Sequence, residues 1–169
     1  MATPVENLSQ PTPSPAPPVT ADRLLELPPR ALDALFGASP AGPIPQGRGE
    51  GTIVALPGTE VAKAINRFFG FLVWRGKNFH PETRDLKNLL SPLAIEGIRA
   101  EVSHDTSWVD GKECVLLDYS RSSRICGWIR DEIREVSPGV YLGVVWGVGR
   151  LFGGRKRVLR FALTFTPRP

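Results

Sequence analysis

The sequence KECVLLDYS (112–120) begins a series of four predicted strands that continues with WIRDEIREV (128–136), VYLGVVWGV (140–148) and KRVLRFALTF (156–165). Each segment is rich in β-branched and aromatic residues, which favour strands. The Ser-Pro-Gly turn at 137–139 predicts a hairpin, because proline suits the second position of a turn and glycine accepts the positive φ that follows. Successive hairpins indicate an antiparallel meander, and a long meander has to close or cover its edges. We therefore expect a mainly β protein built on an antiparallel barrel of about eight strands.

Shorter segments upstream complete the predicted barrel. Three of them, 52–56, 74–79 and 93–104, are expected to be strands, whereas 81–92 is expected to be a loop or a frayed helix. Between the first two strands, residues 59–72 carry apolar side chains at the spacing of an amphipathic helix. We expect that helix to pack on the barrel or to plug one of its mouths.

The N-terminal region has a different composition. Residues 1–20 are rich in proline and serine and have few side chains to bury, so a disordered tail is expected. Residues 21–46 are expected to form a helical lead-in and a loop, with Thr20 capping a first short helix and Pro29 starting a second. Because a length of 169 residues suits one domain, residues 47–169 are assigned to a single barrel domain.

Composition narrows the classes of partner. Hydrophobic residues make up 41% of the chain and charged residues 22%, as in an ordinary soluble globular protein. The net charge is +4, but the cations are dispersed apart from the run at 155–157 and the pairs that flank Trp74 and Trp128, so no nucleic-acid partner is expected. The absence of a secretory signal and of an apolar run long enough to span a membrane predicts a cytoplasmic protein. Aromatic residues flanked by Lys and Arg leave peripheral membrane contact as an alternative, at Phe68, Phe69, Phe71 and Trp74.

The cysteines and histidines do not form a recognisable reactive site. Neither Cys114 nor Cys126 has a histidine within ligand spacing, so we expect buried, reduced thiols and no metal. His80 is predicted to lie in a loop. His104 stands beside Asp105 on a predicted strand, where neighbouring side chains point to opposite faces. No catalytic dyad and no cofactor are therefore assigned.

The order of the motifs resembles a known family. A G-x-G-x-G run at 47–51, a helix, W-x-G-K-x-F at 74–79 and then I-R-D-x-I-R-x-V with G-x-Y-L-G resemble the bacterial lipocalin-like domains named for a G-x-W-x-G motif. The resemblance covers about residues 40–165. The family-like positions are Gly47, Gly49, Gly51, Trp74, Gly76, Lys77, Phe79, Asp118, Arg130, Asp131, Tyr141, Leu142 and Gly143.

The sequence departs from the family pattern at one position. Gly49 stands where those domains carry the tryptophan of the motif, which in many lipocalins closes the base of the barrel, and Trp74 is a candidate to replace it. Such domains are mostly of unassigned function. The resemblance implies a calycin-like barrel that binds a small apolar molecule.

Alternation along the strands identifies interior residues. Asp131 lies on the same face as Ile129 and Ile133, where a carboxylate is costly unless it is paired. Its expected partner is Arg99 or Lys77, either as a structural pair in the barrel wall or as an anchor for the polar group of a ligand. The candidate ligand-binding residues are Trp74, Lys77, Arg99, Tyr119, Asp131, Tyr141, Trp146 and Phe161.

The expected function is intracellular binding of a lipid or another apolar small molecule in the barrel cavity. One alternative is a cofactor-free isomerase, cyclase or hydrolase. In an isomerase or a cyclase, Tyr119 beside Asp118 would act as an acid. A second alternative is a structural or interaction module whose barrel is filled by side chains. No catalytic residue is assigned, and the oligomeric state stays open.

Overall fold

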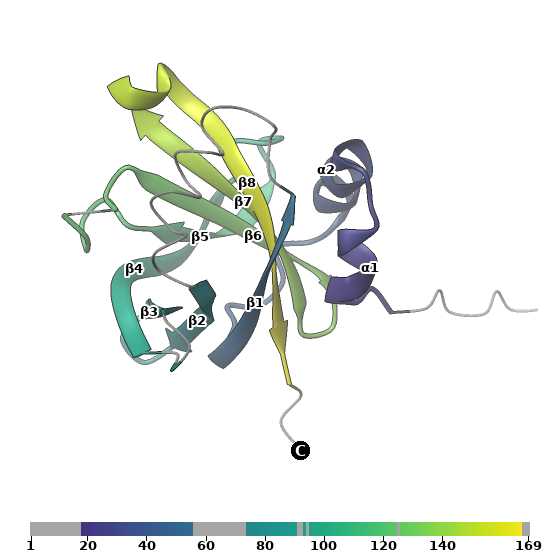
Figure 1. The fold of residues 1–169 in the computed structure, drawn as a ribbon, viewed down its shortest axis with the longest axis horizontal. Helices are drawn as coiled ribbons and strands as arrows, with labels where there is room; N and C mark the ends of the chain where they lie inside the picture. The colour runs from purple at the N-terminus through teal and green to yellow at the C-terminus, as the bar shows by residue number, and fades with distance from the viewer. Residues whose placement is uncertain (1–17, 56–73, 91–92, 94, 125, 167–169) are drawn as a thin grey trace, which may run out of the picture.

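Eight strands form a closed antiparallel barrel in which each strand pairs with its neighbour in the sequence and β8 closes on β1 (Figure 1). The computed structural model describes residues 18–55, 74–90, 93, 95–124 and 126–166. The strands are β1 (Gly47–Ala55), β2 (Trp74–His80), β3 (Asp85–Leu90), β4 (Ile95–Thr106), β5 (Glu113–Asp118), β6 (Ile129–Ser137), β7 (Val140–Gly149) and β8 (Gly154–Phe165). A 3-10 turn, η1 (Arg150–Phe152), links β7 to β8. The predicted mainly β, calycin-like barrel is confirmed.

Three segments predicted from the sequence lie outside the described residues or differ from the structure. The helix expected at 59–72 and nearly all of the tail expected at 1–20 lie outside the described residues. The loop or frayed helix expected at 81–92 is wrong, because Asp85–Leu90 forms strand β3. Its alternation is obscured by Asn88, a poor strand former, which lines the barrel interior together with Leu90.

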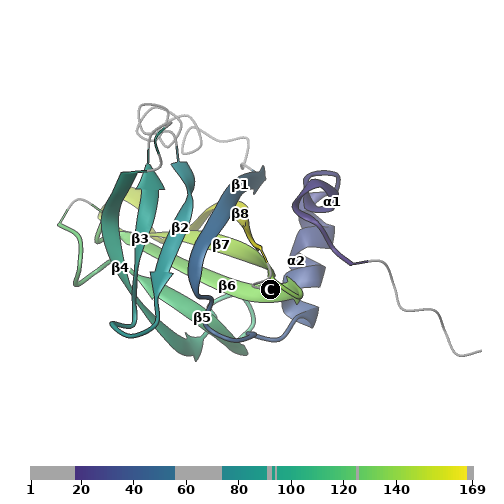
Figure 2. The same cartoon turned by 90° about the horizontal axis from the view of Figure 1, so that it is seen from below.

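Two short helices cover part of the outside of the barrel (Figures 1 and 2). As predicted, the side chain of Thr20 accepts a hydrogen bond from the Arg23 N–H at the start of α1 (Ala21–Leu25), and Pro29 begins α2 (Pro29–Ala38). The buried side chains of the two helices are Leu24, Leu32 and Phe36. They pack against outward-facing residues of β7 and β8, namely Val140, Leu142, Val144, Trp146 and Ala162. The outer face of β7 is therefore buried as well as its inner face.

Aromatic side chains fill the end of the barrel where β1 and β7 begin. The ring centroid of Phe165 lies 5.7 Å from those of Phe79 and Tyr141. The same ring occupies the space beside Gly49, where an added Cβ would lie 2.5 Å from it. Phe165 therefore takes the space that a larger residue at position 49 would need. Trp74, the candidate replacement proposed from the sequence, begins β2 at the opposite end of the barrel.

Gly76 allows β1 and β2 to approach closely. Its φ is 134°, and a Cβ at this position would lie 2.0 Å from the carbonyl oxygen of Gly49. Gly111 also has a positive φ, 74°, but no atom lies within 4 Å of the Cβ that a substitution there would add. Gly76→Ala and Gly111→Ala thus share backbone strain, and only the first adds a clash.

We expect Gly76→Ala to lower the free energy of unfolding by ~1–3 kcal/mol more than Gly111→Ala, the usual range for overpacking. Urea unfolding of the two variants measures the difference. Equal losses would contradict the close approach of the two strands.

Candidate functional site

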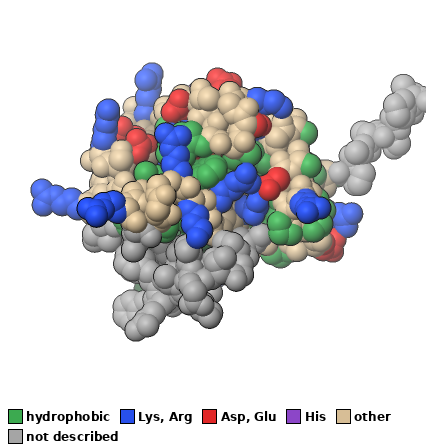
Figure 3. Space-filling model, turned by 90° about the horizontal axis from the view of Figure 1, so that it is seen from above, with side chains coloured by type: hydrophobic (Ala, Val, Ile, Leu, Met, Phe, Trp, Pro, Cys, Tyr) green, Lys and Arg blue, Asp and Glu red, His purple; other side chains and the backbone are tan. Residues whose placement is uncertain are grey.

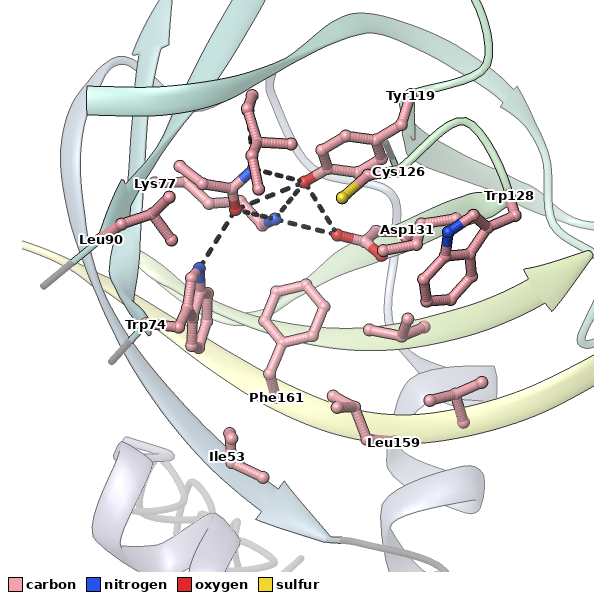
Figure 4. Close-up of a pocket in the computed structure, with 15 residues that line it drawn as sticks. Ile53, Trp74, Lys77, Leu90, Tyr119, Cys126, Trp128, Asp131, Leu159 and Phe161 are labelled. Atoms are coloured by element: carbon pink, nitrogen blue, oxygen red, sulfur yellow. Dashed lines mark hydrogen bonds and ion pairs between the residues drawn. The ribbon is translucent and has the colours of Figure 1, made fainter. Parts of the chain in front are cut away.

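A cavity of about 80 Å³ lies inside the barrel at the end where β1, β3 and β7 finish and β2, β4 and β8 begin. This volume is several times the ~10–15 Å³ that one water molecule requires. Its wall is largely apolar and includes Ile53, Trp74, Leu90, Ile98, Leu159 and Phe161 (Figure 4). The opposite end of the barrel is filled by the Phe79, Tyr141 and Phe165 rings, so the cavity occupies only one end.

Lys77 on β2 and Asp131 on β6 form an ion pair in the wall of this cavity. Lys77 Nζ lies 2.9 Å from Asp131 Oδ2, and the two side chains are only 3% and 4% exposed. Charges removed from water to this degree are tolerated when further hydrogen bonds satisfy them. Of the two partners that the sequence suggests for Asp131, the structure selects Lys77.

Two more buried side chains complete the polar cluster, which we define as Lys77, Asn88, Tyr119 and Asp131. Lys77 Nζ donates to Asn88 Oδ1 at 2.9 Å and to the Tyr119 hydroxyl at 2.5 Å. Asn88 Nδ2 donates to the Ile98 carbonyl at 2.9 Å and to the Tyr119 hydroxyl at 3.0 Å. Four strands, β2, β3, β4 and β6, and the residue that follows β5 are therefore joined through one set of hydrogen bonds. Figure 4 shows the four cluster side chains.

Aromatic rings surround the ammonium group of Lys77. Its Nζ lies 5.6 Å from the centroid of the Trp74 ring, 5.2 Å from that of Tyr119 and 5.4 Å from that of Phe161. Trp74 and Phe161 also make an edge-to-face contact, with centroids 5.5 Å apart. These rings offer the cation favourable π faces and exclude water from the pair.

One polar atom of the cluster has no partner. Among the buried side-chain nitrogen and oxygen atoms of the described residues, Asp131 Oδ1 and Trp146 Nε1 lack a hydrogen bond. In Figure 4 the dashed lines reach one oxygen of Asp131, and the other carries none.

Burial, followed by the negative charge of Asp131, raises the pKa of Tyr119 well above its ordinary value. The Tyr119 hydroxyl therefore stays protonated at neutral pH.

Five of the eight candidate residues predicted from the sequence line the cavity: Trp74, Lys77, Tyr119, Asp131 and Phe161. The remaining three lie elsewhere. Tyr141 packs at the filled end, where its hydroxyl donates to the Pro43 carbonyl at 2.8 Å. Trp146 faces outward toward Trp108, with ring centroids 5.8 Å apart. Strand alternation separates these two residues, because they occupy opposite faces of β7.

Arg99 is the third candidate outside the cavity, and its side chain is 52% exposed. Its Nε donates to Asp85 Oδ2 at 2.5 Å, and His80 Nδ1 lies 3.0 Å from the other carboxylate oxygen. Burial alone would raise the pKa of Asp85, but hydrogen bonds from Thr83, His80 and Arg99 outweigh it and hold that pKa below its ordinary value. Arg99 thus stabilises Asp85 at the barrel rim rather than Asp131.

Sequence reasoning missed several cavity residues. Asn88 was hidden in the segment wrongly assigned to a loop, and the polar cluster depends on it. Cys126 and Trp128, which lie just before β6, also line the cavity. A period-2 pattern that runs from Leu86 through Asn88 to Leu90 could have suggested Asn88, but polar residues at interior positions give no signal of their own.

The two thiols provide a chemical test of this packing. Cys114 and Cys126 are free and buried. Burial is the largest cause that raises the pKa of Cys114 to about 12 and that of Cys126 above its ordinary value. We expect neither thiol of the folded protein to react with a disulfide reagent at pH 8, because the thiolate is the reactive form. Both should react in urea, and rapid reaction of the folded protein would contradict the packing.

The charged surface shows no concentration of one sign on the face seen in Figure 3, where Lys and Arg side chains are spread out with Asp and Glu between them. The helices in the described part of the chain are too short and too polar to cross a bilayer.

Comparisons with known proteins support the fold. No protein-family model matches the sequence, and a search of curated proteins found no match. One solved structure, described as a protein from Thermomonospora curvata, is similar with a TM-score of 0.61 and 19% sequence identity. The match covers 84% of this chain and 90% of that chain. At this level of identity the similarity supports the barrel architecture alone.

Proposed function

We propose that this protein binds a lipid or another apolar small molecule in the barrel cavity. The observation that carries the proposal is the largely apolar cavity at one end of the barrel, with one buried polar cluster in its wall. Binding sites for small molecules are typically concave and apolar with a few precisely placed polar groups. The apolar wall would supply affinity through removal of ligand surface from water, and the polar cluster would orient the ligand.

A cytoplasmic location forms part of the proposal. The support is the pair of free, buried thiols of Cys114 and Cys126, since unpaired cysteines are typical of proteins in a reducing compartment.

The arrangement supports binding better than proton transfer. An isomerase or cyclase that uses Tyr119 as an acid needs its hydroxyl proton to reach the substrate. That hydroxyl contacts Lys77, Asn88 and Asp131, and its raised pKa makes it a weak acid. We therefore assign the hydroxyl to the polar cluster and no catalytic role to it.

The test is a titration of the protein with decan-1-ol in an isothermal titration calorimeter, which measures the affinity. Val145→Phe adds bulk to a residue that lines the cavity, and Leu25→Phe adds the same kind of bulk to an exposed residue of α1. We expect the unmodified protein and Leu25→Phe to bind decan-1-ol and Val145→Phe to bind it at least about tenfold more weakly, a change of ~1.4 kcal/mol. No detectable binding, or equal binding by all three proteins, would contradict the proposal.

A further inference from the structure

The polar cluster offers a ligand one hydrogen-bonding position, and that position is an acceptor. Lys77 has three N–H donors, and they are directed to Asn88 Oδ1, the Tyr119 hydroxyl and Asp131 Oδ2. No N–H of this ammonium group is left to bind a carboxylate or a carbonyl.

The other members of the cluster are also satisfied. Asn88 uses both N–H groups, toward Ile98 and Tyr119, and its Oδ1 accepts from Lys77 and from Trp74 Nε1 at 3.1 Å. The Tyr119 hydroxyl accepts from Lys77 and Asn88, and Asp131 Oδ2 at 3.3 Å is available to its single proton.

Asp131 Oδ1 is the exception. It is buried, belongs to a residue that lines the cavity, and accepts no hydrogen bond from any described residue. A buried carboxylate oxygen without a donor is costly, so a donor from the occupant of the cavity would stabilise it. The occupant would make a charge-assisted hydrogen bond there, which is stronger than one between neutral groups.

The charge of the cluster restricts the ligand further. Lys77 and Asp131 neutralise each other, and aromatic rings surround them. A carboxylate or an ammonium group brought into this site would be an unpaired charge in an apolar cavity, which is strongly unfavourable.

From these observations we propose that the cavity selects a neutral apolar ligand with a hydrogen-bond donor, such as a hydroxyl or an N–H, and that this donor binds Asp131 Oδ1. This inference rests on the proposed function and specifies the chemical class of ligand. It excludes free fatty acids as the preferred ligand.

Three bicyclic compounds of nearly equal shape test the hydrogen bond. Indole has an N–H donor, benzofuran has an oxygen acceptor, and indene has neither. We expect indole to bind the unmodified protein at least about tenfold more tightly than indene, and benzofuran to bind no better than indene. Binding of all three with equal affinity would overturn the inference and leave the proposed function standing. Binding of none, together with no binding of decan-1-ol, would overturn both.

A substitution at Asp131 sharpens the test. In Asp131→Asn the amide oxygen can accept from Lys77, so that the amide N–H group takes the position of Oδ1 and becomes a donor. The order should then reverse, with benzofuran bound more tightly than indole. The matched control is Asp85→Asn, which neutralises another buried aspartate that does not line the cavity and should keep indole first. An unchanged order in Asp131→Asn would overturn the inference.

Asp131→Asn leaves the Lys77 charge without its partner, so the double variant Lys77→Met/Asp131→Leu, which removes both charges and the acceptor, replaces the single variant if that variant does not fold. Loss of the indole preference is expected in the double variant, and retention of that preference would contradict the role of Asp131 Oδ1.

Ligands with a ten-carbon chain test the charge. Decan-1-ol should bind the unmodified protein at least about tenfold more tightly than decanoate or decylammonium, the same chain with an anionic or a cationic end. Decanoate bound as tightly as decan-1-ol would show that the site accepts fatty acids and would overturn the inference.

Discussion

Lys77→Met is expected to lower the free energy of unfolding by ~3–5 kcal/mol, the cost of breaking a buried ion pair by removing one partner. Methionine keeps most of the volume of the lysine side chain, so the main loss is the charge. Asp131, which is 3% exposed, would then be a buried carboxylate without its cation. Asn88 Oδ1 and the Tyr119 hydroxyl would each lose a charged donor. Urea unfolding monitored by circular dichroism measures the change.

The double variant Lys77→Met/Asp131→Asn separates charge from packing. If the cost comes from the uncompensated carboxylate, the second substitution should restore a large part of the stability lost in Lys77→Met. If Asp131→Asn instead lowers the free energy of unfolding of Lys77→Met by as much as it lowers that of the unmodified protein, the two side chains are not coupled. Such a result would contradict the buried pair.

Arg134→Met should cost about 3 kcal/mol, because several hydrogen bonds from one buried charged group are lost together. The Arg134 side chain is fully buried on the outer side of β6. It donates to both oxygens of Asp110 at 2.7 Å and to the carbonyls of Phe36 and Glu113 at 2.9 Å. Arg134 thus links α2 to the barrel, and hydrogen exchange of the α2 amides should accelerate in the variant.

Arg157→Met is the matched control, because Arg157 is 40% exposed and pairs with Asp33 at the surface. An exposed pair contributes ~0–1 kcal/mol, so this variant should remain close to the unmodified protein. If both variants lose the same free energy of unfolding, the buried hydrogen bonds of Arg134 do not stabilise the fold more than an exposed pair does.

The effect of Arg134 should depend on pH. Its hydrogen bonds are the largest cause that holds the pKa of Asp110 below the ordinary value. A lowered pKa in the folded state means that the ionised carboxylate stabilises the fold. This contribution is complete above the ordinary pKa of an aspartate and is lost as the pH falls through the lowered one. The stability difference between the unmodified protein and Arg134→Met should therefore shrink in acid, and a difference that is constant down to pH 2 would contradict this assignment.

The sequence was most informative where strand alternation and turn residues agreed. Val140–Gly149 and Gly154–Phe165 follow the period-2 pattern of a barrel wall, and the Pro138–Gly139 turn sets the hairpin between β6 and β7. The same alternation placed Asp131 on an interior face and so identified the centre of the cavity cluster.

The remainder depends on contacts between distant segments. Whether Asp131 pairs with Lys77 or Arg99 depends on barrel register, since Arg99 has its own partner in Asp85. The outer face of β6 carries Glu132 and Arg134, which a sequence pattern assigns to solvent. Both are fully buried, because α2 and the turn around Ser107 and Asp110 cover them. Local periodicity does not encode such coverage, which also buries the outward-facing side chain of Trp146.

The most direct test of cavity binding is a crystal structure of the protein grown with saturating indole. We predict the indole ring inside the barrel cavity, with its N–H at about 2.7–3.2 Å from Asp131 Oδ1, the usual range of an N–H···O hydrogen bond. A barrel interior without indole, or with indole bound only on the outer surface, would contradict the account.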